Sequence, residues 1–303
     1  MSASATVAPR VAALGKGATR TRWSVVIDVA FSVALFVGTA VGVIALAMLL
    51  WTVYDRGWDR LAADPVGFLQ NFSSRRATRA GIKAALYGSV YLMGLVTLFA
   101  VPIGVGASLY LEEFAPKNRI TNFVEANIAN LAGVPSVVYG ILGLGVFVRF
   151  MQMGETLLAA GLTLGVMSLP VVIIAGREAI RAVPSSIRDG AYGLGATKWQ
   201  AVRSLVLPAA LPGMLTGTIL ALSRAIGETA PLLVIGAAVS IFTVPKGVNE
   251  RFTALPIMVF EWTQRPQKAF AATAAAAIIV LLALLLAMNA VAIFLRNRYT
   301  TRW

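Results

Sequence analysis

Long apolar stretches separated by shorter polar segments dominate the pattern of the 303-residue chain. A helix needs about 20 consecutive apolar residues to cross the roughly 30 Å hydrocarbon core of a bilayer. We therefore predict an all-α integral membrane protein with six transmembrane helices. The predicted spans are residues 25–53, 84–109, 123–148, 156–176, 208–240 and 269–295.

Two of these spans are irregular. The third contains Glu125 and Pro135, so we expect its first half to be amphipathic or buried in protein, because irregular backbone exposed to lipid leaves polar groups unsatisfied. The fifth contains Pro208, Pro212 and Pro231 and is predicted to be broken at these prolines.

Pairs of glycines four residues apart recur along the predicted spans. Such pairs let helices approach closely, and we interpret them as sites of packing within the chain. The pairs are Gly38 and Gly42, Gly161 and Gly165, and Gly213 and Gly217.

The composition agrees with a membrane protein, since 58% of the residues are hydrophobic and only 13% are charged. The chain has no cysteine and no histidine, which excludes disulfides, thiolate or histidine metal sites and nucleophiles paired with histidine. We accordingly expect no enzyme, no metal and no cofactor. The net charge of +13 is spread over tails and loops, which favours contact with anionic lipid headgroups and argues against a nucleic-acid partner.

The N-terminal segment resembles a signal peptide, because basic residues precede an apolar stretch. The stretch is too long and lacks a cleavage-type ending, so we predict a retained anchor helix. The predicted division is a tail (1–22), an anchor helix with its following loop (23–83), a membrane core (84–295) and a second tail (296–303).

The polar segment 177–207, between the fourth and fifth spans, contains signals for two short helices. Pro184 followed by serines marks a helix start, while Gly193 and Gly195 mark its end with a left-handed turn. Thr197 is a predicted N-cap for the second helix. The pattern predicts a helix–turn–helix unit lying on the membrane surface.

This segment is similar to the cytoplasmic EAA loop of permeases from ABC importers. The matching residues are Asp189, Gly190, Ala191, Gly195, Leu207 and Pro208. The resemblance implies a coupling helix that docks into a separate ATPase subunit, with a rigid turn at Gly195 and an aromatic contact from Trp199. Asp189 and Gly190 depart from the typical Glu and Ala, although they preserve charge and small size. The alternative is an amphipathic surface helix without a partner.

Two charged residues, Arg224 and Glu228, lie inside the fifth predicted span. A charge at the bilayer centre costs about 2.5 to 3.5 kcal/mol, so the two side chains should pair, face protein or line a water-filled path. Their spacing of four residues predicts one helical face. A structural ion pair and a transport-active pair are both compatible with the pattern.

The sequence around these charges narrows the resemblance to the A-subunit permeases of phosphate ABC importers. The segment RAIGETAPLL, beginning at Arg224, is similar to the signature of that family. Three further segments resemble the same family and occur in the expected order: 110–116, 133–147 and 253–266. The similarity extends over about residues 81–295 and implies the fold of a type I ABC importer permease.

The resemblance also implies roles and partners. Arg224 would contact the phosphate anion transiently, and Glu228 would be its alternating partner. Pro135 and Ser136 would either line the same path or pack at a subunit interface. No P-loop motif occurs, so ATP hydrolysis is expected in another subunit. The implied assembly contains a homologous C-type permease, two copies of an ATP-binding subunit and a periplasmic or lipid-anchored phosphate-binding protein.

The resemblance places the chain in the bacterial inner membrane, with segment 177–207 and both termini in the cytoplasm. The distribution of Lys and Arg supports this orientation only narrowly, since Arg75, Arg76, Arg79 and Lys83 would lie outside. Two alternatives stay open: a permease for another oxyanion such as sulfate, phosphonate or molybdate, and a transporter or channel that works without ATP.

Overall fold

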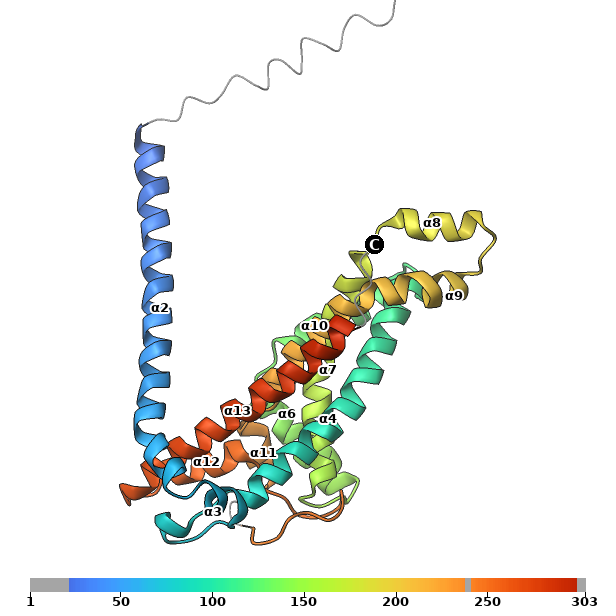
Figure 1. Cartoon of the computed structure of the whole chain (residues 1–303). Helices are drawn as coiled ribbons and strands as arrows, with labels where there is room; N and C mark the ends of the chain where they lie inside the picture. The colour runs from blue at the N-terminus through green and yellow to red at the C-terminus, as the bar shows by residue number, and fades with distance from the viewer. Residues whose placement is uncertain (1–21, 238–240, 299–303) are drawn as a thin grey trace, which may run out of the picture. The chain divides into compact units, whose positions relative to one another are not determined.

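The computed structural model describes residues 22–237 and 241–298, and all regular structure in these ranges is helical (Figure 1). The chain divides into two compact units at Thr52 and Val53. The first helix, α2 (Arg22–Ala63), begins in one unit and ends in the other. It confirms the first predicted span and continues well past residue 53.

Four further helices or helical runs are long and apolar enough to cross a membrane. They confirm the second, fourth and sixth predicted spans and the first half of the fifth. The helices are α4 (Lys83–Leu109), α7 (Leu157–Arg181), α10 (Leu207–Ala225) and α13 (Ala269–Arg298).

The third predicted span is bent by 105°, which confirms that it is irregular. It consists of α5 (Arg119–Ala132) and α6 (Ser136–Gly143), the latter continued by a π-helical segment, η3 (Leu144–Phe150). Between them, Pro135 has extended backbone and no amide proton to continue the helix. Six crossings therefore result if the bent pair counts as one span.

The fifth predicted span is broken, but not at the first two prolines. Pro208 lies at the start of α10, just after the π-helical segment that precedes this helix, and Pro212 lies inside α10, so both are accommodated within the continuous helical run Lys198–Ala225. The break follows Ala225, and the chain resumes as α11 (Ala230–Ile235). The predicted end of this span, residues 238–240, lies outside the described residues.

Helices α4, α7 and α10 form the centre of the second unit, with α7 in contact with both others. Two of the glycine pairs make these contacts possible. A Cβ atom at Gly161 or Gly165 would meet Leu95 or Phe99 of α4, and one at Gly213 or Gly217 would meet an alanine of α7. Packing within the chain is confirmed for these two pairs, whereas Gly38 and Gly42 have no neighbouring atom within 4 Å.

Short helices lie at one end of the second unit (Figure 1). They surround a buried aromatic cluster, in which Trp262 contacts Phe68 and Phe270 with tilted rings at centroid distances of 6.5 and 6.2 Å. The guanidinium groups of Arg60 and Arg265 lie over the outer two rings. The short elements are α3 (Pro65–Gln70), η1 (Ala77–Arg79) and α12 (Leu255–Thr263).

Candidate coupling surface and transport site

The segment between α7 and α10 forms the predicted helix–turn–helix unit. Helix α8 (Ser185–Gly193) begins after Pro184, and Gly195 has a φ of +79°. Glycine adopts this left-handed conformation without a steric penalty. Thr197 caps α9 (Lys198–Ala201) in a complete capping box, and the π-helical η4 (Val202–Val206) leads into α10. The predicted start, turn and N-cap are all confirmed.

The outer surface of this unit presents large apolar groups beside an acidic one. Leu194 is 91% exposed and Trp199 is 54% exposed. Asp189 and Gly190 are exposed, and no atom lies within 4 Å of a Cβ placed on Gly190. A clustered apolar tip on a short polar segment is typical of a surface that another protein covers.

Three of the predicted coupling residues face inward instead. Ala191 is only 5% exposed, and its carbonyl accepts the amide of Ala196 at 3.1 Å. Leu207 and Pro208 are half-buried at the start of α10. Close approach of a partner is therefore possible at Gly190, while Ala191, Leu207 and Pro208 fix the unit to the rest of the chain.

A network of ion pairs beneath this unit was not predicted as a site from the sequence. Arg177 pairs with Glu112 at 3.3 Å and with Glu125 at 2.7 Å. Arg181 pairs with Glu112 at 2.9 Å, and Arg188 of α8 pairs with Glu113 at 2.8 Å. The sequence signal for this network was two adjacent acids, Glu112 and Glu113, after the second predicted span, together with several arginines after the fourth.

Arg224 and Glu228 form an ion pair, with 3.3 Å between Nε and Oε1. Arg224 lies in the last turn of α10, but Glu228 lies in the break after the helix. The prediction that both occupy one helical face is wrong, because α10 ends at Ala225; backbone bonds from Gly227 to Arg224 and from Glu228 to Ala225 keep them close. The Arg224 side chain is 52% exposed and that of Glu228 only 16%.

The two helix breaks lie close together. Tyr139, in α6, donates its hydroxyl proton to the carbonyl of Leu131 in α5 at 2.8 Å, and this ring packs in one cluster with Ala225 and Ile226. Pro135 is exposed and Ser136 half-buried at the α5–α6 break. The structure thus brings Arg224, Glu228 and the Pro135–Ser136 turn into one region.

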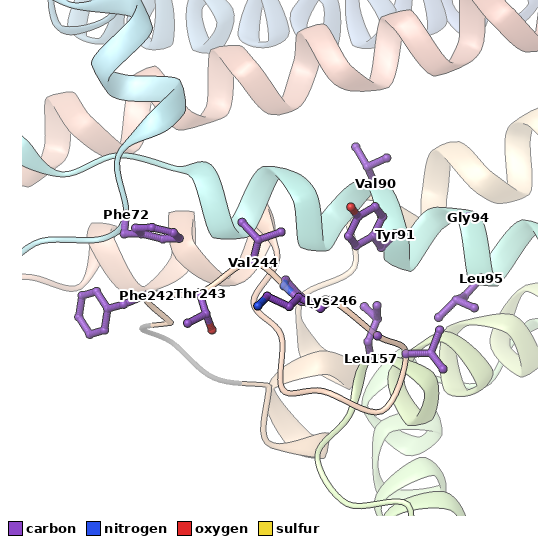
Figure 2. Close-up of a pocket in the computed structure, with 13 residues that line it drawn as sticks. Phe72, Val90, Tyr91, Gly94, Leu95, Leu157, Phe242, Thr243, Val244 and Lys246 are labelled. Carbon is purple, nitrogen blue, oxygen red and sulfur yellow. The ribbon is translucent and has the colours of Figure 1, made fainter.

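A separate cavity of about 1050 Å³ lies between α4 and the segment that leads to α12 (Figure 2). Its lining is mostly apolar and aromatic, with Phe72, Tyr91 and Phe242 beside a single cation, Lys246. Neither Arg224 nor Glu228 lines it. A mostly apolar lining with one cation does not match a binding site for an oxyanion. The paired charges at the helix breaks are therefore the better candidate for the anion site.

Comparison with known proteins gives consistent matches. Residues 100–299 match the family model described as "Binding-protein-dependent transport system inner membrane component". The phosphate transport system permease protein PstA 1 of Mycobacterium tuberculosis is 33% identical over 77% of this chain and 77% of its own length. The probable ABC transporter permease protein YqgI of Bacillus subtilis is 37% identical over 55% of this chain, a match that spans 56% of that protein.

Two more matches concern a second permease type and a solved structure. The phosphate transport system permease protein PstC of Mesorhizobium japonicum is 32% identical over 63% of this chain and 67% of its own length. A structure of the MetNI methionine ABC transporter in an inward-facing conformation superposes with a TM-score of 0.57 at 19% identity. It covers 72% of this chain and 97% of that chain, which shows the fold alone.

Proposed function

Because this chain belongs to the binding-protein-dependent transport system inner membrane component family, we propose that it is a transmembrane permease subunit of an ATP-driven importer of inorganic phosphate. The observation that carries the proposal is the 33% identity to PstA 1 over 77% of both chains. The helical fold with its apolar spans is that of a type I ABC importer permease.

Arg224 is the proposed anion contact of the transport path. Its planar guanidinium matches phosphate oxygens in geometry, and its side chain is half exposed beside two helix breaks. Only Nε is engaged by Glu228 among the contacts of the described residues, which leaves the terminal nitrogens for a passing anion. Glu228 takes the arginine back after the anion leaves, so the site does not trap its substrate.

Pro135 and Ser136 form the neighbouring break. They either line the same path or pack against the second permease, and their partial exposure is compatible with both. Uptake and assembly of a Ser136→Ala chain separate the two roles, because a path residue affects uptake alone and an interface residue affects assembly.

The proposed assembly contains a homologous C-type permease, two ATP-binding subunits and an external phosphate-binding protein. The similarity to PstC supports a paired permease of related sequence. Docking to the ATPase is assigned to the outer face of α8, the following turn and α9, where Asp189, Gly190, Leu194 and Trp199 are exposed. ATP hydrolysis belongs to that separate subunit.

The proposed orientation in the bacterial inner membrane places segment 177–207 and both tails, 1–22 and 296–303, in the cytoplasm. Residues 23–83 then comprise the anchor helix and a periplasmic segment, and 84–295 form the permease core. Within the second unit, α8 lies at one end and α3 with α12 at the other (Figure 1). This separation supports a cytoplasmic coupling end and a periplasmic end.

The test is ATP-dependent uptake of radiolabelled phosphate by vesicles that hold the reconstituted complex. Arg224→Ala should abolish most uptake and leave assembly intact. Gly195→Pro should uncouple hydrolysis from uptake, because proline cannot adopt the φ of +79° at this turn. Gly193→Ala, in open space two residues earlier, is the matched control and should behave as wild type.

The outcomes discriminate between substrates and between mechanisms. Uptake of sulfate but not phosphate keeps the architecture and overturns the substrate. Phosphate flux through this chain alone, independent of ATP, overturns the importer proposal altogether.

A further inference from the structure

The C-terminal end of α4 contacts α7 and the two short helices that follow it, α8 and α9. Helix α4 continues into a π-helical segment, η2 (Tyr110–Phe114). Three consecutive residues of η2 each hold a different element: Glu112 binds arginines of α7, Glu113 binds Arg188 of α8, and Phe114 contacts α9. Consecutive residues of a helix point in different directions, so one turn can reach three neighbours.

The Arg188 guanidinium makes four hydrogen bonds in this region. Its Nε and one terminal nitrogen donate to the same oxygen of Glu113, at 3.0 and 2.8 Å. The terminal nitrogens also donate to the carbonyl oxygens of Ile180 at 3.0 Å and Val183 at 2.8 Å. One guanidinium on α8 therefore joins the end of α4 and the end of α7.

The contact is shielded from solvent on the Glu113 side. The Glu113 side chain is 7% exposed and that of Arg188 is 19% exposed. Loss of one partner from such a pair leaves an unpaired buried charge, which costs more than loss of an exposed pair. Separating the two groups is therefore costly.

A second contact, made by two aromatic rings and a lysine, joins η2 to α9. The rings of Phe114 and Trp199 have centroids 6.3 Å apart, and the Lys198 ammonium lies 5.3 Å from the centre of the Phe114 ring. Trp199 nevertheless stays 54% exposed, so the same side chain touches η2 and presents a face to the outside.

We propose that η2 is the receiving element through which displacement of the coupling helix α8 is passed to α4, with Glu113 as the positioning residue. This inference rests on the proposed function, since it requires an ATPase that moves α8. The outer face of the unit carries the docking groups Asp189, Gly190 and Leu194, and the inner face carries Arg188. Force applied outside therefore reaches α4 and α7 through the Arg188 guanidinium.

The experiment measures phosphate transported per ATP hydrolysed by the reconstituted complex. Glu113→Gln keeps the side-chain shape and removes the charge. We expect assembly and ATP hydrolysis to persist while the transported phosphate per ATP falls about fivefold or more, the lower end of typical coupling between two sites. The swapped pair, Glu113→Arg with Arg188→Glu, should recover part of the ratio because it restores opposite charges.

Glu178→Gln is the matched control. Glu178 also pairs with an arginine at the same end of α7, at 3.3 Å from Arg181, but its side chain is 66% exposed and forms no ion pair with η2 among the residues that the structure describes. Its transport ratio should equal that of wild type. The inference is overturned if Glu113→Gln transports with the wild-type ratio, or if hydrolysis, uptake and assembly all fall together and the swapped pair restores none of them. A wild-type complex that takes up no phosphate refutes the proposed function instead.

Discussion

At the scale of single residues, the unequal exposure of Arg224 and Glu228 is compatible with the different roles proposed for them. The arginine is 52% exposed and the carboxylate 16%, and only one nitrogen of the arginine joins them. A bridge built for stability would bury both partners and use the guanidinium fork in full. This pair leaves the fork open, as required for a contact that forms and breaks in each cycle.

Glu228→Gln tests that role. With a neutral partner, Arg224 has no charge to return to, so the anion is held longer. We expect the maximal uptake rate to fall roughly threefold to tenfold, in line with the ~1 kcal/mol carried by a typical hydrogen bond, while the purified complex retains more labelled phosphate.

A purely structural bridge gives the opposite pattern. In that case Glu228→Gln lowers the melting temperature of the complex and leaves phosphate retention unchanged. Glu178→Gln, which breaks a pair with Arg181, is the control for loss of a carboxylate on a helix of the same chain.

The sequence identified Arg224 and Glu228 because charges inside an apolar span are conspicuous. It did not identify Glu113 as the partner of Arg188, since the two lie 75 residues apart and each reads as an ordinary charge at the end of a span. Pairings of this kind depend on tertiary packing, and no local pattern encodes them.

At the scale of helices, local signals predicted the coupling unit well and the breaks less well. Pro184, Gly195 and Thr197 act through their own backbone or cap, so their effect could be read from neighbouring residues. The break after Ala225 lies just before Pro231, the third proline predicted to break this span, whereas Pro208 and Pro212 carried the same signal and are tolerated within α10. Whether a helix accommodates a proline depends on where the proline lies in that helix. The predicted span boundaries were too coarse to give this position.

Gly217→Ala tests the close contact between α7 and α10. A Cβ atom there would collide with the Cβ of Ala175, which has no rotamer that moves it away, so the helices must separate. We expect a loss of about 1–3 kcal/mol of stability, as for other overpacked sites, measured as a lower melting temperature of the purified protein.

Gly106→Ala is the control with the opposite expected sign. No atom lies within 4 Å of a Cβ at Gly106 in α4, so the better helix propensity of alanine should leave stability unchanged or raise it by about 0.5–1 kcal/mol. Equal melting temperatures for both variants would contradict the packing of α7 against α10.

At the scale of the whole second unit, contacts fix which ends of the helices lie together. The end of α4 and the end of α7 meet at Glu112 and Arg177. The start of α7 meets the segment before α12, where the amide of Leu157 donates to the carbonyl of Glu250 at 3.0 Å. The bent pair α5–α6 leads from the first of these ends to the second, which favours one crossing by this pair and six in all among the described residues.

Single cysteines test this crossing and the proposed orientation together, because the chain contains no cysteine of its own. Leu194→Cys and Lys117→Cys should react with a membrane-impermeant thiol reagent only from the cytoplasmic side, and Gln152→Cys and Lys268→Cys only from outside. All four positions are exposed in this chain, and labelling is done without the ATP-binding subunit proposed to cover Leu194, so a lack of reaction reports the side and not burial. If Gln152→Cys reacts from the same side as Lys117→Cys, the bent pair re-enters the membrane without crossing it; if all four sides are exchanged, the proposed orientation is inverted while the fold stands.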